Sequence, residues 1–160
     1  MSLSRRQMLI ALSMGASVSP LTAHAQTAVL TITRQKHAPV QLQMSDILAL
    51  PQHHFTARTP WYKDPVVFTG PLLRDVLQAA GIRGGTQLQA VALDEYRISI
   101  PLEDIQRFGV IAALQINGQS LTRRDKGPLF IVYPFDSDPQ LQSVRYYERS
   151  IWQLKALDVQ

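Results

Sequence analysis

Short apolar segments separated by turn residues dominate this chain, and that pattern limits the folds open to it. Residues 28–34 alternate Leu30 and Ile32 with threonines, which is typical of a strand with one buried face. Similar segments predict further strands at 39–44, 88–93, 96–100, 110–116, 129–133 and 150–159. Regular helical crossovers do not separate these segments. The sequence therefore predicts an α+β fold with a mixed β-sheet and short helices.

Helices are few in this interpretation. The clearest one spans about 72–80, where apolar side chains fall on one face, and Gly70, Pro71 and Gly81 mark its ends. Ser45 is expected to cap a short helix that ends at Leu50, and 101–106 predicts one helical turn. The pairs at 94–95 and 117–118 predict tight turns between strands. Residues 52–65 are polar and contain two prolines, so we expect a long loop there.

The N-terminus has the order of a secretory signal. Arg5 and Arg6 precede an apolar run at 8–18, and a small-residue A-x-A site ends at Ala25. The run is shorter than the roughly 20 residues that a membrane-spanning helix needs. We expect a signal peptide at 1–25 and one periplasmic domain at 26–160 that does not span a membrane. Export by the Sec or the twin-arginine route fits, because residues 4–9 are close to the twin-arginine motif.

Composition excludes several classes of protein. The chain has no cysteine, which excludes disulfides, thiolate zinc sites, iron–sulfur clusters and cysteine nucleophiles. Apolar residues make up 46%, enough for a core without such cross-links. The formal net charge of +4 falls by two when Arg5 and Arg6 leave with the signal. A weakly basic chain with mixed signs does not indicate a nucleic-acid partner.

Groups that could form a catalytic centre are sparse. The serines have no G-x-S-x-G setting, and no phosphate-binding glycine motif occurs. His53 and His54 are adjacent, and on an extended segment their side chains point to opposite faces, so they do not readily share one metal ion. The sequence predicts no catalytic residue and no metal site.

Aromatic and cationic side chains are concentrated in the predicted loop and in residues 133–152. Such groups bind planar or anionic ligands through stacking and forked hydrogen bonds. Our candidates for binding a ligand or a partner are His54, Arg58, Trp61, Tyr62, Lys63, Arg145 and Tyr147.

Three motifs in register then point to a family. Residues 68–81 resemble the F-x-G-x-x-L-x-D-L-L-x-x-A-G stretch of the sulfite-oxidase-type, molybdopterin-binding oxidoreductase domain. Residues 94–101 are similar to its D-x-Y-x-x-x-I-P segment, and 116–134 to its N-G-x-P-L and G-P-L-R-L-V-x-P run. The order and spacing agree over about 28–158. The resemblance implies the molybdopterin-binding-domain fold, and the segments 59–61 and 146–154 look typical of a short, stand-alone, secreted branch.

One departure from the family matters for function. Catalytic members bind molybdenum through a cysteine in a C-x-x-x-W setting, and the residue four positions before Trp61 is Ala57. A methyl group cannot ligate a metal. The resemblance therefore implies the fold without the catalytic ligand, and we expect no bound cofactor.

We expect a periplasmic, non-catalytic binding module for a small ligand, or for a membrane-bound signalling or redox protein. The alternative is a molybdopterin-binding oxidoreductase, or a subunit of one, that holds the cofactor without a cysteine ligand. A third possibility is a subunit that only packs against another protein. The sequence names neither the ligand nor a reaction.

Overall fold

The computed structural model describes residues 28–160, and the predicted signal peptide lies outside these residues. The strands are β1 (Leu30–Arg34), β2 (Val40–Leu42), β3 (Gln52–Ala57), β4 (Val66–Pro71), β5 (Gln87–Ala92), β6 (Arg97–Pro101), β7 (Ile111–Ala113), β8 (Gln115–Ile116), β9 (Gln119–Ser120), β10 (Phe130–Val132) and β11 (Leu154–Val159). The helices are α1 (Met44–Ala49), α2 (Leu73–Ala79), α3 (Leu102–Arg107) and α4 (Val144–Arg149), with a 3₁₀ turn at Pro139–Leu141. The predicted α+β class with mixed sheets and short helices is confirmed.

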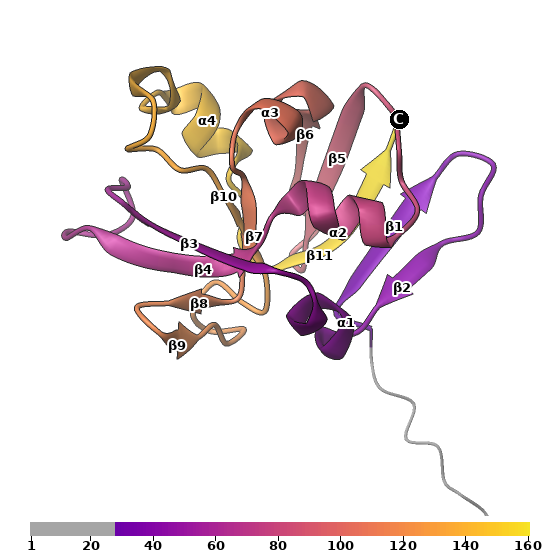
Figure 1. Cartoon of the computed structure of the whole chain (residues 1–160), viewed down its shortest axis with the longest axis horizontal. Coiled ribbons are helices and arrows are strands. Elements are labelled where there is room, and N and C mark those ends of the chain that lie inside the picture. Colours follow the sequence, from indigo (N-terminus) through magenta and orange to yellow (C-terminus); the bar gives the residue numbers. More distant parts are fainter. Residues whose placement is uncertain (1–27) are drawn as a thin grey trace, which may run out of the picture.

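Three sheets make up the described chain (Figure 1). The largest has the order β2-β1-β11-β5-β6, in which β1 and β11 are parallel and the other neighbours are antiparallel. A second sheet has the order β3-β4-β8-β9, and β7 pairs with β10. Because β1 pairs with β11, the first and last strands of the described chain lie side by side in the interior of the larger sheet.

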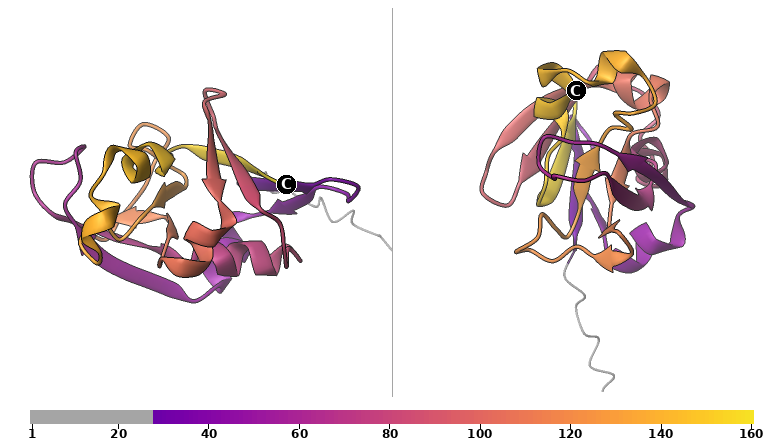
Figure 2. Two further views of the ribbon diagram at one scale, coloured as in Figure 1. Left: turned by 90° about the horizontal axis from the view of Figure 1, so that it is seen from above. Right: turned by 90° about the vertical axis from the view of Figure 1, so that its left-hand side faces the viewer.

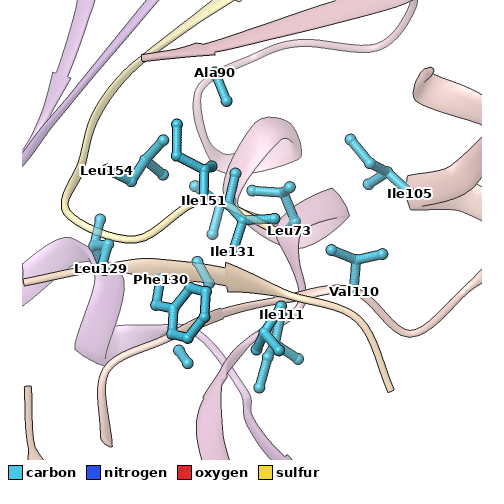
Figure 3. Packing of buried hydrophobic residues seen from close by; sticks show 14 of the residues in the cluster. Leu73, Ala90, Ile105, Val110, Ile111, Leu129, Phe130, Ile131, Ile151 and Leu154 are labelled. Atoms are coloured by element: carbon cyan, nitrogen blue, oxygen red, sulfur yellow. The ribbon is translucent and has the colours of Figure 1, made fainter. Parts of the chain in front are cut away.

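The core lies where these sheets meet. Figure 3 shows Leu73 of α2, Ile105 of α3 and Ile111 of β7 gathered around β10. Phe130 and Ile131 of β10 are fully buried. Fully burying one such side chain contributes roughly 1.5–3 kcal/mol, so β10 contributes substantially to the stability of the fold although it is short. A continuous apolar run at 129–133 is the sequence signal for this central strand.

Close packing between β4 and β7 depends on a glycine. A Cβ atom added at Gly70 would collide with the carbonyl oxygen of Ala112 and lie 2.7 Å from Cα of Ala113. No real side chain tolerates those separations, so only glycine lets the two backbones approach this closely.

Several predicted elements are confirmed. The 94–95 turn joins β5 and β6, and Asn117 and Gly118 take φ angles of 50° and 75° between β8 and β9. Two positive φ angles in succession are what a tight hairpin with this sequence requires. The alternation at 28–34 and the helix near 72–80 also appear, as β1 and α2.

The prediction of a loop over 52–65 was wrong in its first half. Residues 52–57 form β3, which pairs with β4 in register from Gln52 and Pro71 to Ala57 and Val66. Its polar side chains are mostly exposed, because β3 is an edge strand held by backbone hydrogen bonds to an apolar neighbour. The true loop is 58–65, and we name it the Trp61 loop.

Smaller corrections concern element ends. Ser45 is not the cap of α1; Gln43 is, and its backbone N–H donates to Oδ2 of Asp46 at 2.7 Å. The expected strand over 110–116 is two strands, because Leu114 instead donates its N–H to the carbonyl of Thr69. The last strand begins at Leu154 rather than near 150, and α4 was not predicted. Within 28–160, no helix combines the length and the apolar character needed to cross a bilayer.

Candidate functional site

An apolar pocket of about 440 Å³ opens between the β5–β6 hairpin and α4. Its lining comes from the Trp61 loop, the hairpin, α4 and the segment before β11: Trp61, Ala92, Asp94, Tyr96, Val144, Tyr147, Glu148, Ser150, Ile151 and Trp152. Figure 2 shows the β5–β6 hairpin projecting away from β3 and β4. This volume lies in the range of small-molecule sites, and we name the feature the aromatic pocket.

Trp61 lines this pocket and packs against four other aromatic rings. Its ring meets Phe130 and Phe135 edge-on, with centroids 5.5 and 6.0 Å apart. It meets Tyr147 and Trp152 at 6.1 and 5.9 Å, with planes at 81° and 86°. Edge-to-face aromatic pairs each contribute about 0.5–1.5 kcal/mol beyond their buried area. The Trp61 loop is therefore anchored by its indole despite its irregular backbone.

Exposed apolar side chains gather at the same place. Tyr96 is 50% exposed, Val144 68% and Trp152 38%, and all three line the aromatic pocket. The fourth large apolar side chain in this exposure class within 28–160 is Leu48 on α1, outside the pocket. Scattered apolar side chains on a surface are normal, but a contiguous group indicates a binding surface.

Charged groups surround the aromatic pocket unevenly. Asp94 and Glu148 line it, and Lys126 lies outside the lining. The Nζ atom of Lys126 is 5.1 Å from the ring centre of Trp152 and 5.2 Å from that of Tyr62. Burial raises the pKa of the Tyr62 hydroxyl, and the nearby Asp125 carboxylate raises it further. Tyr62 therefore stays a neutral hydroxyl at physiological pH.

A buried ion pair holds α4 in place. Asp104 of α3 is 7% exposed, and its Oδ2 accepts hydrogen bonds from Tyr133 Oη at 2.9 Å and Arg149 Nη1 at 2.6 Å. Burial raises the pKa of Tyr133 well above its usual value, and the Asp104 carboxylate adds to this effect. Because Arg149 ends α4, this network fixes the helix that supplies one wall of the aromatic pocket.

Two other cavities are larger than the aromatic pocket, but their linings are more polar. One, of about 560 Å³, lies between α2 and α3 and is lined by charges of both signs, including Arg74, Asp75 and Glu103. The other, of about 520 Å³, lies against β1 and β11. Neither is lined by aromatic side chains, so the aromatic pocket is the stronger candidate site.

The structure brings two of the seven predicted site residues, Trp61 and Tyr147, into the aromatic pocket. Arg58 lies at the start of the Trp61 loop, where its Nε is 3.4 Å from Oδ2 of Asp136. The others lie on the Trp61 loop, on β3 and on α4, outside the lining: Tyr62, Lys63, His54 and Arg145. Their part in binding stays a prediction.

Sequence reasoning missed Tyr96, Val144 and Trp152 as site residues. Two signals were present in the sequence. Tyr96 follows the predicted turn at 94–95, and an aromatic residue beside a hairpin turn is readily exposed. Val144 and Tyr147 are three residues apart, which places them on one face of a helix that follows Ser143.

The residues present do not fit the metal ligation of the catalytic family members. Ala57 ends β3 with its methyl group fully buried, and the sequence contains no thiol that could replace it. Within 28–160, no three or more acidic or histidine side chains are grouped so that they could hold a metal ion. This chain therefore lacks the cysteine ligand through which the catalytic members bind molybdenum.

Comparisons with known proteins agree with the fold. Residues 17–136 match the family described as the oxidoreductase molybdopterin binding domain. A search of the curated proteins gives no match. Among solved structures, the chain is similar to the sulfane dehydrogenase SoxCD from Paracoccus pantotrophus, with a TM-score of 0.63 and 20% identity. The similarity covers 84% of this chain but 38% of that chain, and at this identity it shows the fold alone. By its sequence match over most of its length, the chain belongs to the oxidoreductase molybdopterin-binding domain family, and it does so without a cysteine.

Proposed function

We propose that this protein is an exported, non-catalytic binding module that holds a small ligand in the aromatic pocket. The observation that carries this proposal is the convergence of Tyr96, Val144 and Trp152, all solvent-exposed, around the half-buried Trp61. A ligand that covers these groups removes apolar surface from water, and each 100 Å² so covered contributes about 2.5 kcal/mol.

The polar groups of the aromatic pocket favour binding over catalysis. The Ser150 hydroxyl donates to the carbonyl of Tyr146 at 3.1 Å, so it is already used within α4. Asp94 and Glu148 remain as the titratable acids of the lining, and no histidine or lysine lies among the lining residues to activate a nucleophile. The lining thus has the groups to hold and orient a ligand but not a nucleophile–base pair.

The proposal places the protein in the periplasm, where a membrane-bound sensor or redox protein would respond to the loaded module. The signal-like N-terminus supports export. The Trp61 loop and α4, which both contribute to the lining, also carry exposed cations outside it, Arg58, Lys63 and Arg145, and these would give such a partner charged groups to contact.

A nuclear magnetic resonance titration tests the binding function. A panel of water-soluble compounds, each with one aromatic ring and a positive, negative or neutral substituent, is added to the ¹⁵N-labelled chain 26–160. We expect shifts confined to residues of the aromatic pocket. Trp152→Ala should weaken binding about 30-fold, the effect of losing a hot spot worth about 2 kcal/mol.

Leu48→Ala is the matched control, because Leu48 is 54% exposed but lies on α1, and it should leave binding unchanged. Arg58→Ala is titrated in parallel. If that change abolishes binding while Trp152→Ala does not, the site lies on the Trp61 loop surface instead. If no compound of the panel shifts the pocket residues, the small-ligand function is wrong.

Metal analysis tests the non-catalytic part of the proposal. Protein purified from its native export route is assayed for molybdenum and for turnover of sulfite and sulfoxides with artificial electron carriers. We expect neither. Molybdenum near one atom per chain, together with turnover, would establish the alternative of an oxidoreductase that holds molybdopterin without a cysteine ligand.

A further inference from the structure

The lining of the aromatic pocket carries an unusual charge for this protein. The chain has a formal net charge of +4, or +2 without Arg5 and Arg6, yet the ten described residues that line the pocket include two carboxylates, Asp94 and Glu148, and no cationic side chain. We infer that the ligand is an organic cation, with an ammonium or quaternary ammonium group on a small apolar body. This inference rests on the proposed function and names its ligand class.

The lining contains several aromatic rings, the side chains that attract such a cation. Trp61, Tyr96, Tyr147 and Trp152 all line the pocket. The planes of Tyr147 and Trp152 stand at 81° and 86° to that of Trp61. Several aromatic rings around one site are also the feature by which aromatic cages bind alkylated ammonium groups. A neutral apolar ligand would gain from burial alone, whereas a cation gains from burial and from the ring faces.

Trp152 already accepts an ammonium group elsewhere. Lys126 is not part of the lining, but its Nζ lies 5.1 Å from the Trp152 ring centre. The fold thus already holds one ammonium group within cation–π distance of this indole.

The two carboxylates of the lining are available to a ligand. Cations near the hairpin are held by Glu95 instead, which pairs with Lys155 and, at 3.8 Å, with Arg97. Asp94 Oδ1 accepts the Tyr96 N–H at 3.1 Å, which fixes this carboxylate at the rim. Within the described chain neither Asp94 nor Glu148 takes part in an ion pair. Their charges therefore act on whatever enters the pocket.

Three compounds of nearly one shape test this inference. Choline, 3,3-dimethylbutan-1-ol and 3,3-dimethylbutanoate share nearly one branched skeleton and carry a positive charge on the branched head, no charge, and a negative charge at the opposite end, respectively. Each is titrated into ¹⁵N-labelled protein at low and at physiological salt. We expect choline to bind on the order of tenfold more tightly than the alcohol, and the carboxylate to bind most weakly.

A charge-neutralising variant separates electrostatics from shape. Asp94→Asn with Glu148→Gln keeps side-chain size, and the asparagine retains the acceptor for the Tyr96 N–H. It should reduce the preference for choline over the alcohol by several-fold, because the lost charges weaken choline binding more than binding of the neutral alcohol. Glu103→Gln removes an exposed acid at the polar cavity between α2 and α3, and it should change neither the affinity for choline nor that for the alcohol.

The outcomes keep the two proposals distinguishable. If the alcohol shifts the pocket residues with an affinity equal to that of choline, the cation inference is wrong and the binding function stands. If none of the three compounds binds, the cation inference is also wrong, and the wider aromatic panel decides the binding function by itself. A choline preference that survives the double substitution would likewise overturn the role assigned to the two carboxylates.

Discussion

Replacement of Asp104 by asparagine tests whether the buried network fixes α4. Asp104 receives hydrogen bonds from Tyr133 and Arg149, and the Arg149 side chain is 21% exposed. Removing one partner of a buried ion pair costs about 3–5 kcal/mol, because the other charge is left uncompensated. Asparagine retains one acceptor and Arg149 keeps some solvent. We therefore expect a loss near the lower limit, about 3 kcal/mol of unfolding free energy.

Urea unfolding followed by circular dichroism measures this loss. The midpoint should fall while the slope of free energy against urea stays unchanged, as for a change in stability alone. Asp64→Asn in the exposed part of the Trp61 loop is the control, and should change the unfolding free energy by less than about 0.5 kcal/mol. If Asp104→Asn is as mild as the control, the network does not stabilise α4 and our account of this pocket wall is incorrect.

The same network predicts a pH dependence. The pKa of Tyr133 is raised in the folded protein, so its contribution is complete below the usual tyrosine value of 10.0 and decreases as the pH rises above it. One tyrosine lowers stability by at most about 1.4 kcal/mol per pH unit in that range. Tyr133→Phe should remove this part of the alkaline loss. Equal alkaline slopes in the two proteins would show that Tyr133 ionises as freely in the fold as outside it.

Further predictions follow from packing and sequence. Trp61→Ala should lower the unfolding free energy by roughly 3–5 kcal/mol, measured by urea unfolding, because this indole contacts four other rings. A loss as small as that of an exposed residue would show that Trp61 does not support the core. Gly70→Ala should cost at least 1–3 kcal/mol, or prevent folding, because β7 leaves no room for a methyl group; a normal melting temperature would contradict that contact. Ala57→Cys should fold yet give no sulfite turnover in steady-state assays. Turnover by this variant would show that the cysteine is the only group that the chain lacks for activity. Intact mass spectrometry of the exported protein should show a chain that begins at Gln26, and a mass that includes residues 1–25 would refute cleavage.

Local patterns determined much of the secondary structure. Alternation predicts β1, the pair Asn117-Gly118 predicts the turn between β8 and β9, and the apolar run at 129–133 predicts β10. These elements are readable because their signals lie within a few residues and reflect backbone angles or a single buried face. The family motifs predicted the overall fold in the same way, since three local motifs in register were enough.

Tertiary pairing decided the elements whose own residues are ambiguous. β3 reads as a loop because its side chains are polar, yet it is a strand because β4 offers an edge of backbone donors and acceptors. The helix α4 is short, and its position depends on the buried pair between Arg149 and Asp104, which are far apart in the sequence. Secondary-structure propensity depends on the residues of a segment alone, so it predicts neither of these interactions.

The aromatic pocket is the clearest case of what the sequence alone left open. Trp61 and Tyr147 were predicted among seven candidates for binding a ligand or a partner, and Tyr96 and Val144 were not predicted. The four come from a loop, a hairpin and a helix, and each is an ordinary aromatic or aliphatic residue in its own segment. The parallel pairing of β1 with β11 and the antiparallel pairing of β11 with β5 bring the segment before β11 beside the β5–β6 hairpin. The sequence determined which side chains were available, and only the long-range strand pairing decided that they share one pocket, because their contact depends on register between distant strands.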